Sequence, residues 1–473
     1  MVERLHIRQA RLVSIGTFGL ADVADVLVED GKIAAIGPDL VVGSAEVIQA
    51  RGMILAPGFV DTHRHVWQTQ LRTVATDWSL FDYVVNIRRV FSTLYTAEDV
   101  YLGNHIGALE ALDAGITTIV DHCHILNSPE HAELAVSGLQ DAGIRGIFCY
   151  GTFHNEPRVA TRIPSDLNWR YATAEALRAG RLSDDHGLIQ FGFAPAEAEA
   201  MPFDALKQEL SIARRLGSAA ISCHVAVGAY DRGNRLVEKL AEHGLLGPDL
   251  LFVHGSSLTG GELDLIRESG AGISATPETE LQMGMGFPVA SRALEAKVRV
   301  GLGVDIVSNY SGDMFSQMRL GLQSTRAVRN QAYETAGLAP AVISPKAADY
   351  LEMATLGGAR AIRKDKEIGS IEVGKAADLI LVATDSIHMT PALNPVGALV
   401  LNARPSDIDT VLVAGKFLKR GGRLIHADLP RMRERFQTSA NAIQDRLLPA
   451  YVETAYVAAS QYYKRLSWPA LKE

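Results

Sequence analysis

The central part of the chain alternates short apolar runs with longer segments of helical pattern. The apolar runs cover 54–63, 116–123, 144–151, 188–195, 219–225, 250–254, 271–276 and 298–305. Expected helices between them, each ending in glycine, cover 96–115, 131–143, 203–217 and 261–270. Parallel strands that are buried on both faces are continuously apolar. Eight strand–helix units over about 250 residues predict an α/β fold, a (β/α)8 TIM-type barrel.

A doubly wound sheet is the alternative to the barrel. It would carry a GxGxxG phosphate-binding turn after its first strand, and the sequence there lacks that motif. The barrel therefore fits the pattern better.

Strand-like segments recur at both ends of the chain. Those near the start cover 12–16, 25–30 and 32–37, with a hairpin signal at Asp30-Gly31. Those near the end cover 369–383 and 407–422, after an expected helix at 348–362. We expect a composite β-sandwich domain (1–56 plus 366–427), a barrel domain (57–365) and a C-terminal helical extension (428–473) for packing or an interface.

Composition narrows the class of protein. The 473 residues are 47% hydrophobic and 21% charged, with a net charge of −8, which is typical of a globular domain and unlike a nucleic-acid binder. No apolar run reaches the length of a membrane span, and the start lacks a signal-peptide pattern. Three scattered cysteines do not form a disulfide framework. A cytoplasmic location without membrane or nucleic-acid partners is expected.

The candidate chemistry lies at the ends of the apolar runs, where barrel active sites form. The first run ends in His63-Arg64-His65, the fifth in His224, the sixth in His254 and the eighth in Asp305. Histidines two apart on an extended segment share a face, so both rings can hold one ion. Imidazole and carboxylate donors suit Zn²⁺, with Fe²⁺, Mn²⁺ or Co²⁺ as alternatives.

These segments resemble the amidohydrolase superfamily, in the branch of triazine hydrolases and cytosine, guanine and S-adenosylhomocysteine deaminases. The segments that carry the resemblance are PGFVDTHRH (57–65), LEALDAGITTIVDH (109–122), LFVHGSSLTGGELDLIRESGAGIS (251–274), VGLGVDIVSNYSGDMFSQMR (300–319) and IGSIEVGKAADLILV (368–382). The resemblance implies that His63, His65, His224 and Asp305 bind the metal. His254 would contact the substrate or the attacking water. Binuclear members carry a lysine at the end of strand four, which 191–197 lacks, so one ion is expected.

The expected reaction is hydrolytic. A bound divalent ion lowers the pKa of water from about 15.7 to about 7. Asp305 would accept the proton of that water, and His254 would orient it and stabilise developing charge. The attacked atom would be an sp² carbon bearing an amino, substituted amino, chloro or amide-type leaving group.

Two departures from the branch bear on proton transfer. Its deaminases carry His-x-x-Glu on strand five, whereas Val227 stands at the glutamate position here. Strand seven is followed by Pro277-Glu278-Thr279-Glu280. We hypothesise that Glu280 or Glu278 supplies the missing acid; the alternative is a solvated loop with two surface acids.

Further candidates follow the first two strands. Trp67 and Gln68 are expected near the pocket mouth, where Trp67 could stack on a flat ring or only pack within a loop. His122 is a candidate substrate contact or a lining residue. The long segment after the first strand, with Trp78 and Tyr83, is a possible lid.

The leading interpretation is a mononuclear metal-dependent hydrolase that displaces an amino, substituted amino or chloro group from a nitrogen heterocycle. The alternative is hydrolysis of an amide, urea or carbamate C–N bond, which the missing strand-five glutamate favours. A non-catalytic metal-binding barrel is a third interpretation. The expected partners are a small-molecule substrate and further copies of the chain in a homo-oligomer.

Overall fold

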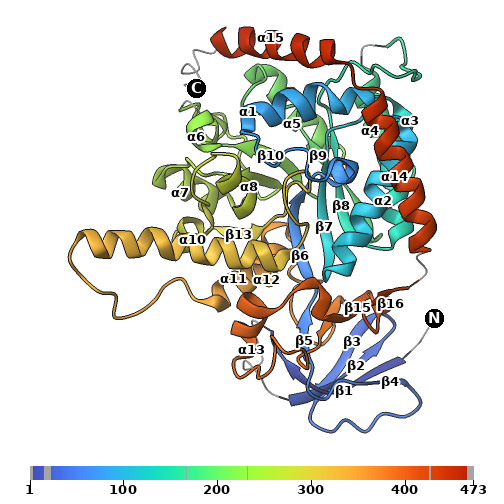
Figure 1. Ribbon diagram of the computed structural model, residues 1–473, viewed down its shortest axis with the longest axis vertical. Helices are drawn as coiled ribbons and strands as arrows, with labels where there is room; N and C mark the ends of the chain where they lie inside the picture. The colour runs from blue at the N-terminus through green and yellow to red at the C-terminus, as the bar shows by residue number, and fades with distance from the viewer. Residues whose placement is uncertain (1–3, 15–22, 167, 232, 426–427, 466–473) are drawn as a thin grey trace.

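The computed structural model describes residues 4–14, 23–166, 168–231, 233–425 and 428–465. Figure 1 shows a helix-covered barrel above a separate sheet. That sheet combines strands from the beginning of the chain, in blue, with strands from its end, in orange and red. The predicted fold class, a barrel beside a sheet built from both chain ends, is confirmed.

The barrel strands form an eight-stranded parallel sheet in chain order. They are β6 (Phe59–Arg64), β7 (Ile116–Cys123), β8 (Arg145–Gly151), β9 (Ile189–Ala194), β10 (Ile221–Val225), β11 (Leu250–His254), β12 (Gly272–Ala275) and β13 (Arg299–Leu302). Every residue of β6, β7, β9 and β11 is buried, as expected for strands with helices outside and side chains inside.

Backbone contacts beyond the last strand close the barrel. His65 N–H donates to the Asp305 carbonyl at 2.8 Å, and Asp305 N–H donates to the His63 carbonyl at 2.8 Å. The closure therefore brings together the first and the last of the candidate metal ligands.

The first predicted apolar run, 54–63, contributes to both sheets. β5 (Ile54–Pro57) pairs with β1 and β14 of the other sheet, and β6 begins two residues later. The chain passes between the sheets at Gly58, where a Cβ would lie 2.1 Å from Thr117 Oγ1. A single continuous strand was the wrong interpretation of this run, because its two halves are buried by different partners.

Helices cover the barrel strands. The principal ones are α2 (Ala97–Asp113), α3 (Pro129–Ala142), α4 (Trp169–Ala179), α5 (Phe203–Arg215), α6 (Leu236–Glu242), α7 (Gly260–Ser269), α8 (Pro277–Gln282), α9 (Ala290–Glu295), α10 (Met314–Thr335), α11 (Ala347–Met353) and α12 (Leu356–Ala361). The predicted capping box forms: Thr96 N–H donates to Asp99 Oδ2 at 2.9 Å, and Asp99 N–H donates to Thr96 Oγ1 at 3.2 Å. The left-handed Gly143 and Gly270 end α3 and α7 as expected.

Short helical turns fill the connections. After β6 come η1 (Val66–Leu71), α1 (Leu80–Tyr83), the π-helical η2 (Val84–Arg88) and η3 (Phe91–Leu94). The others are η4 (Gly228–Tyr230), α13 (Pro395–Gly397), η5 (Ala398–Asn402) and η6 (Pro405–Asp407).

The second sheet has nine strands in the order β17-β16-β15-β14-β5-β1-β2-β3, with β4 beside β1. They are β1 (Arg4–Leu12), β2 (Val23–Glu29), β3 (Lys32–Gly37), β4 (Glu46–Gln49), β5, β14 (Leu379–Val382), β15 (Ile408–Val413), β16 (Lys416–Arg420) and β17 (Arg423–Leu424). The predicted hairpin is confirmed, with φ of 48° at Asp30 and 77° at Gly31. β1 begins earlier than the predicted strand at 12–16, of which residues 15 and 16 lie outside the described residues.

Two carboxyl-terminal predictions need correction. The expected strand at 369–383 is extended only in β14, because residues 369–378 form turns that include Gly374 at φ 94°. The expected helix at 348–362 is two helices, since Thr355 between them has φ −130° and ψ −100°.

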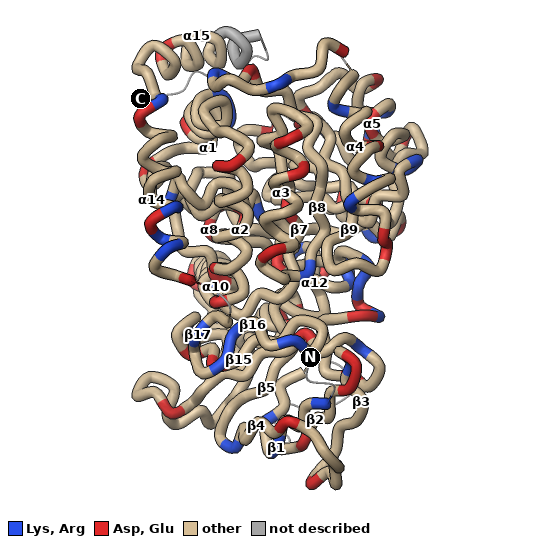
Figure 2. The backbone as a smooth tube through the Cα atoms, turned by 90° about the vertical axis from the view of Figure 1, so that its right-hand side faces the viewer, with Lys and Arg blue, Asp and Glu red and all other residues tan. Residues whose placement is uncertain are grey.

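The end of the chain forms α14 (Leu429–Asp445) and α15 (Pro449–Arg465); residues 466–473 of the predicted extension lie outside the described residues. Ser439 Oγ on α14 donates to Asp99 Oδ1 at 2.6 Å. Figure 2 shows acidic and basic positions interspersed along the tube. Within the described part of the chain, no helix has the length and apolar character needed to cross a membrane.

Candidate metal centre and active site

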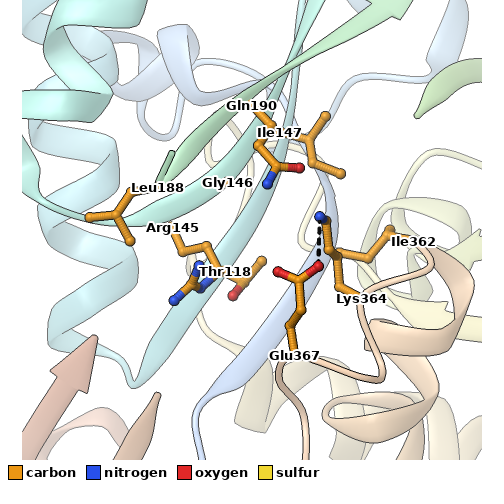
Figure 3. A pocket seen from close by; sticks show the side chains of 9 residues that line it. All are labelled: Thr118, Arg145, Gly146, Ile147, Leu188, Gln190, Ile362, Lys364 and Glu367. Atoms are coloured by element: carbon orange, nitrogen blue, oxygen red, sulfur yellow. Dashed lines mark hydrogen bonds and ion pairs between the residues drawn. The ribbon is translucent and has the colours of Figure 1, made fainter. Parts of the chain in front are cut away.

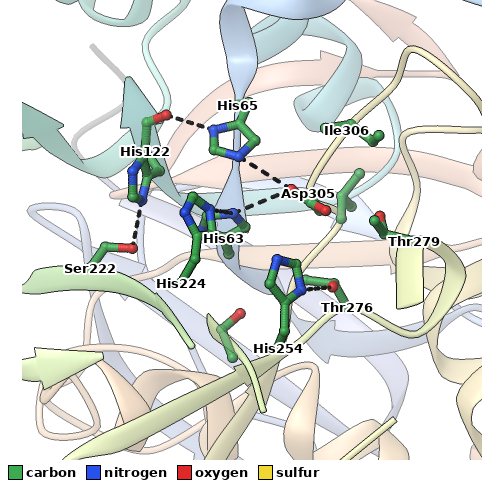
Figure 4. Close-up of polar contacts among 12 residues, drawn as sticks. His63, His65, His122, Ser222, His224, His254, Thr276, Thr279, Asp305 and Ile306 are labelled. Carbon is green, nitrogen blue, oxygen red and sulfur yellow. Dashed lines mark hydrogen bonds and ion pairs between the residues drawn. The ribbon is translucent and has the colours of Figure 1, made fainter. Parts of the chain in front are cut away.

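Five predicted side chains converge at the carboxyl ends of the barrel strands (Figure 4). His63 lies on β6 and His65 immediately after it, His224 lies on β10, His254 ends β11, and Asp305 follows β13. All but His224 are at least nine-tenths buried, and its side chain is 13% exposed. The strand-end pattern in the sequence thus corresponds to one buried cluster.

Four of these side chains face one another closely. His63 Nε2 lies 3.3 Å and His65 Nε2 lies 3.4 Å from Asp305 Oδ1. His224 Nε2 lies 3.4 Å from His63 Nε2. Donor atoms of His63, His65 and Asp305 lie within 4.8 Å of one another, as do those of His63, His122 and His224.

Neighbouring groups fix the rings so that Nε2 faces the centre. His65 Nδ1–H donates to the His122 carbonyl at 2.7 Å. His224 Nδ1–H donates to Glu197 Oε2 at 3.2 Å. A hydrogen bond at one ring nitrogen leaves the other as an acceptor, and such bonds orient metal-binding histidines. The donor set therefore fits a divalent ion of the zinc type.

The protonation states of the two histidines and of Asp305 also suit metal binding. Burial lowers the pKa of His63 to about 4, and it also lowers that of His65, so both rings are neutral. Burial alone would raise the pKa of Asp305, but the hydrogen bond to His63 and the nearby His254 hold it well below its usual range. Neutral imidazoles beside an ionised carboxylate are the forms that bind metals.

His254 lies beside this set with strained backbone. Its φ is 71°, and that of Asp305 is 68°, a region that non-glycine residues adopt at functional sites at a cost of about 1–3 kcal/mol. His254 Nδ1 lies 2.9 Å from Thr276 Oγ1 and 3.6 Å from Glu280 Oε1. Both contacts are made by Nδ1 of His254, so its other ring nitrogen, Nε2, takes no part in them.

The two strand-seven acids have different surroundings. Glu280 is fully buried behind Thr276, whose N–H donates to Glu280 Oε1 at 2.9 Å. Glu278 accepts a hydrogen bond of 2.7 Å from Gln317 Nε2 on α10. Only Glu280 of this pair is in contact with the histidine cluster, through Thr276 and His254.

The expected substrate contacts at the pocket mouth lie deeper than predicted. Trp67 is fully buried, and its indole N–H donates to His124 Nδ1 at 3.1 Å. Gln68 Nε2 donates to Tyr83 Oη at 2.6 Å, and Gln68 is also fully buried. The mouth position was wrong for both, because η1 turns into the core after His65.

His122 lies within the cluster, as expected of a lining residue. Its Nδ1 is 3.0 Å from Ser222 Oγ, and its ring stacks on His224 with centroids 4.4 Å apart. Of the described residues, His63, His122 and His224 form the second group with metal-binding geometry.

Sequence reasoning missed Glu197, Arg88 and His124. Glu197 Oε1 accepts from Arg88 Nη1 at 2.6 Å while its other oxygen contacts His224. Burial would raise the pKa of Glu197, but Arg88 and His224 hold it well below the usual range. Glu197 follows the fourth apolar run, so the strand-end criterion was a usable signal for it. Arg88 carries no such signal.

A cavity at the opposite end of the barrel is not part of this site (Figure 3). It lies near the beginnings of β7 and β8 and is lined in part by Lys364 and Glu367, which form an ion pair at 3.0 Å. Its volume is about 10 Å³, which is the space of about one water molecule.

The fold and the donor set define a class of protein: a metal-dependent hydrolase built on a (β/α)8 barrel. The amidohydrolase family model matches residues 54–418, and the chain belongs to this family. The predictions of family, fold and enzyme class, a hydrolase that acts on non-peptide C–N bonds, are therefore confirmed.

Relatives with known names extend over most of the chain. It is 29% identical over 435 residues to the 5-methylthioadenosine/S-adenosylhomocysteine deaminase of Desulforudis audaxviator, covering 90% of this chain and 95% of that protein. It is 28% identical over 432 residues to the 5'-deoxyadenosine deaminase of Methanosarcina barkeri, covering 89% and 94%.

Solved structures agree with the fold. An adenosine deaminase from Xanthomonas campestris with bound zinc has a TM-score of 0.81 at 26% identity, covering 93% of this chain and 98% of that one. The atrazine chlorohydrolase of Arthrobacter aurescens, complexed with zinc, has a TM-score of 0.81 at 20% identity, covering 92% and 100%. The latter likeness concerns the fold alone.

Proposed function

We propose that the protein is a mononuclear zinc-dependent aminohydrolase that removes an amino group from a nitrogen heterocycle of the adenine type. The observation that carries the proposal is the buried cluster in which His63 Nε2 and His65 Nε2 lie 3.3 and 3.4 Å from Asp305 Oδ1, with His224 Nε2 3.4 Å from His63 Nε2. The relatives are named as deaminases of adenosine derivatives, which supports an amino group as the leaving group. The proposed ligands are His63, His65, His224 and Asp305.

The ion, when bound, supplies Lewis-acid activation of water. Side chains of the protein then transfer the protons and orient the water. The Asp305 carboxylate accepts a proton from the attacking water, since its lowered pKa keeps it ionised beforehand. It then returns this proton to the departing amino group, which leaves as ammonia while the water oxygen stays on the ring carbon. His254 Nε2 orients that water and stabilises charge on the attacked carbon's substituents. Burial of the cluster excludes competing solvent.

Within this proposal, Glu280 is a positioning residue. It holds Thr276 against His254 and favours a protonated Nδ1 on that ring. Contact with Glu280 and the charge of Asp305 raise the pKa of His254, although burial alone would lower it. Glu278 contacts α10 instead, so we assign it no part in proton transfer.

A Glu280→Gln variant tests this assignment. We expect turnover to fall about 10²-fold or more, with a shift of the basic limb of the pH–rate profile that reflects His254. The Glu278→Gln variant serves as the control with near-unchanged turnover. Equal rates for both variants and the wild type would contradict the assignment.

Val227 favours a second candidate function. A valine cannot protonate a ring nitrogen, so the site could instead cleave an amide, urea or carbamate C–N bond, where the leaving nitrogen lies outside a ring. The two functions differ in product: free ammonia from a ring carbon in the first case, and a carbonyl product with an amine in the second.

The deciding experiment uses chelated protein reloaded with Zn²⁺. Ammonia, amine and chloride release would be measured for adenosine, 5'-deoxyadenosine, guanine, cytosine, melamine, atrazine and a set of aryl ureas and carbamates. We expect ammonia release from at least one aminated ring, loss of the activity with chelator, and loss of both zinc and activity in Asp305→Ala. No turnover of any compound by the zinc-loaded protein would contradict the proposed function.

We also propose a cytoplasmic homo-oligomer with the domain boundaries of the sequence analysis (1–56 plus 366–427, 57–365 and 428–473). Cys123, Cys149 and Cys223 are buried free thiols, which suits a reducing compartment. Light scattering of the purified protein tests the oligomer, and a monomeric mass would contradict it.

A further inference from the structure

Arg88 is a buried cation with an unusual distribution of hydrogen bonds. It lies on the π-helical turn η2 of the long segment after β6 and is 5% exposed. Its Nη1 donates to Glu197 Oε1 at 2.6 Å. Its Nε and Nη2 atoms have no hydrogen-bond partner among the described residues. Leaving buried N–H donors unpaired costs about 1–3 kcal/mol per group, and more on a charged group.

The two unpaired atoms form one edge of the guanidinium. In a planar guanidinium, Nε–H and one Nη2–H point in parallel, which is the fork that binds a carboxylate or another pair of oxygen lone pairs. The Phe153 ring lies 4.2 Å from Arg88 Cζ and holds the plane from one side. Glu197 holds the other edge, so the free fork has a fixed direction.

The position of Arg88 ties the fork to the metal cluster. Glu197, which holds Arg88, also holds His224 through its second oxygen. Ser92 Oγ donates to the Arg88 carbonyl at 2.7 Å and lies 3.1 Å from Asn155 Oδ1. Asn155 Nδ2 in turn donates to the His124 carbonyl at 3.2 Å.

His124 presents a second unpaired donor in the same network. Its Nδ1 accepts the Trp67 indole N–H, so the neutral ring carries its proton on Nε2. That Nε2 is buried without a partner among the described residues. The ring stacks on His65 at a centroid distance of 4.0 Å. Arg88 and His124 thus present three unpaired donor atoms beside the predicted metal ligands, Arg88 through Glu197 and His124 through its stacking on His65.

We infer that Arg88, assisted by His124, binds an oxygen acceptor of the substrate, a ring carbonyl or a carboxylate, that is distinct from the leaving group. The inference deepens the proposed function and rests on it. Glu197 already neutralises the charge of the Arg88 guanidinium. The unpaired fork therefore offers the substrate directed hydrogen-bond donors rather than a net positive charge. A substrate that carries such an oxygen is therefore preferred over its analogue that lacks it, since the analogue leaves the donors unpaired.

The test compares ring pairs that differ in one oxygen group. Xanthine against hypoxanthine examines a ring carbonyl at a carbon other than the reacting one, and orotate against uracil examines a carboxylate. Binding to the zinc-loaded protein would be measured by calorimetry and by the rise in Tm. In at least one pair, we expect the member with the additional oxygen group to bind the wild type about 10- to 100-fold more tightly than the other member.

Variants then assign the preference to Arg88. Arg88→Lys keeps a cation for Glu197 but lacks the fork, and we expect it to abolish the preference while retaining the zinc content and Tm of the wild type. Arg89→Lys is the matched control, because Arg89 is the exposed neighbour of Arg88. The control retains the full preference. Arg88→Met provides a second variant in case lysine rebuilds the contact through one hydrogen bond.

Each outcome decides the inference. Equal binding within both pairs, binding by none of the four probes, or a preference that survives both Arg88 variants would overturn it. Failure of the proposed function has a different signature, namely no turnover of any compound by zinc-loaded protein. An enzyme that releases ammonia but shows no Arg88-dependent preference would refute this inference alone.

Discussion

At the residue scale, Glu197 links the metal ligands to the surrounding charge network. It orients His224 and is itself held by Arg88. Such supporting carboxylates are worth about 10- to 100-fold in metal affinity. We therefore predict that Glu197→Gln weakens zinc binding by that factor, measured by competition with a chromogenic chelator.

Glu199→Gln is the matched control for this measurement. Glu199 lies two residues further along, and its carboxyl accepts the Ala226 N–H at 2.9 Å. Burial raises the pKa of Glu199 to about 8, so glutamine resembles its protonated form. Zinc affinity equal to wild type in Glu199→Gln and reduced in Glu197→Gln would support the role; equal affinities in both would refute it.

The residues of the cluster differ in how far the sequence alone could reveal them. His63, His224 and Asp305 are metal-binding types at strand ends, and a barrel brings all strand ends to one face. Glu197 contacts His224, which lies 27 residues further along the chain, and the backbone of Glu197 has a left-handed φ of 46°. Arg88 enters through a π-helical turn within a loop, and residue patterns do not determine such loop paths.

At the scale of elements, the C-terminal helix α15 braces the segment that carries Arg88. Tyr456 Oη donates to Asp82 Oδ1 at 2.7 Å and accepts from Asn86 Nδ2 at 3.1 Å. We predict that Tyr456→Phe lowers stability by about 1 kcal/mol and increases amide exchange in residues 80–90. Tyr333→Phe, at an exposed position of α10, is the control. Unchanged exchange in both variants would show that α15 does not restrain the segment.

The contact between α8 and α10 predicts a pH effect. Burial, and then the nearby Asp313, raise the pKa of Glu278 to about 8 from its ordinary value of 4.5. The folded state therefore binds the proton more tightly than the unfolded state. The contribution of protonated Glu278 to the free energy of unfolding is therefore complete below a pH of about 4.5. It is lost as the pH rises to about 8 and above.

We predict that Glu278→Gln removes this loss. The variant should match the wild type at pH 4.5 and exceed it at pH 8, by roughly 2–4 kcal/mol. The difference in Tm between the two proteins at each pH measures it. Glu334→Gln, an exposed substitution on α10, should show no such trend. A Glu278→Gln advantage that is the same at both pH values would contradict the assigned cause.

The elements themselves were largely predictable, with errors where tertiary contacts override local pattern. The glycine-terminated helices and the Asp30-Gly31 hairpin follow from backbone preferences that act locally. The run at 54–63 has one apolar pattern but two burial partners, and Gly58 lets the chain pass between them. The hydrophobic pattern of a sequence indicates which residues are buried, but it does not indicate which sheet they pack in.

At the scale of the whole molecule, the proposed ion joins the two strands that close the barrel. His63 and His65 lie on the β6 side of the closure, and Asp305 lies on the β13 side. Backbone hydrogen bonds join the two sides, as do hydrogen bonds from Thr62 Oγ1 to the Leu302 carbonyl and from Val304 N–H to Asp61 Oδ1. An ion held across this seam binds the folded chain and not the unfolded one. At a free zinc concentration about 100-fold above Kd, it stabilises the fold by about 2.7 kcal/mol.

We therefore predict that chelation lowers the Tm by several degrees and that restored zinc reverses the change. Asp305→Ala removes one ligand and should make the Tm independent of zinc. Glu334→Gln should respond to zinc as the wild type does. Because the ion would secure the closing seam, amide exchange upon chelation should rise first in β6 and β13 rather than in β8 and β9 on the far side of the strand order. A wild-type Tm that does not depend on zinc, or a rise in exchange shared equally by all eight strands, would show that the ion does not hold the seam.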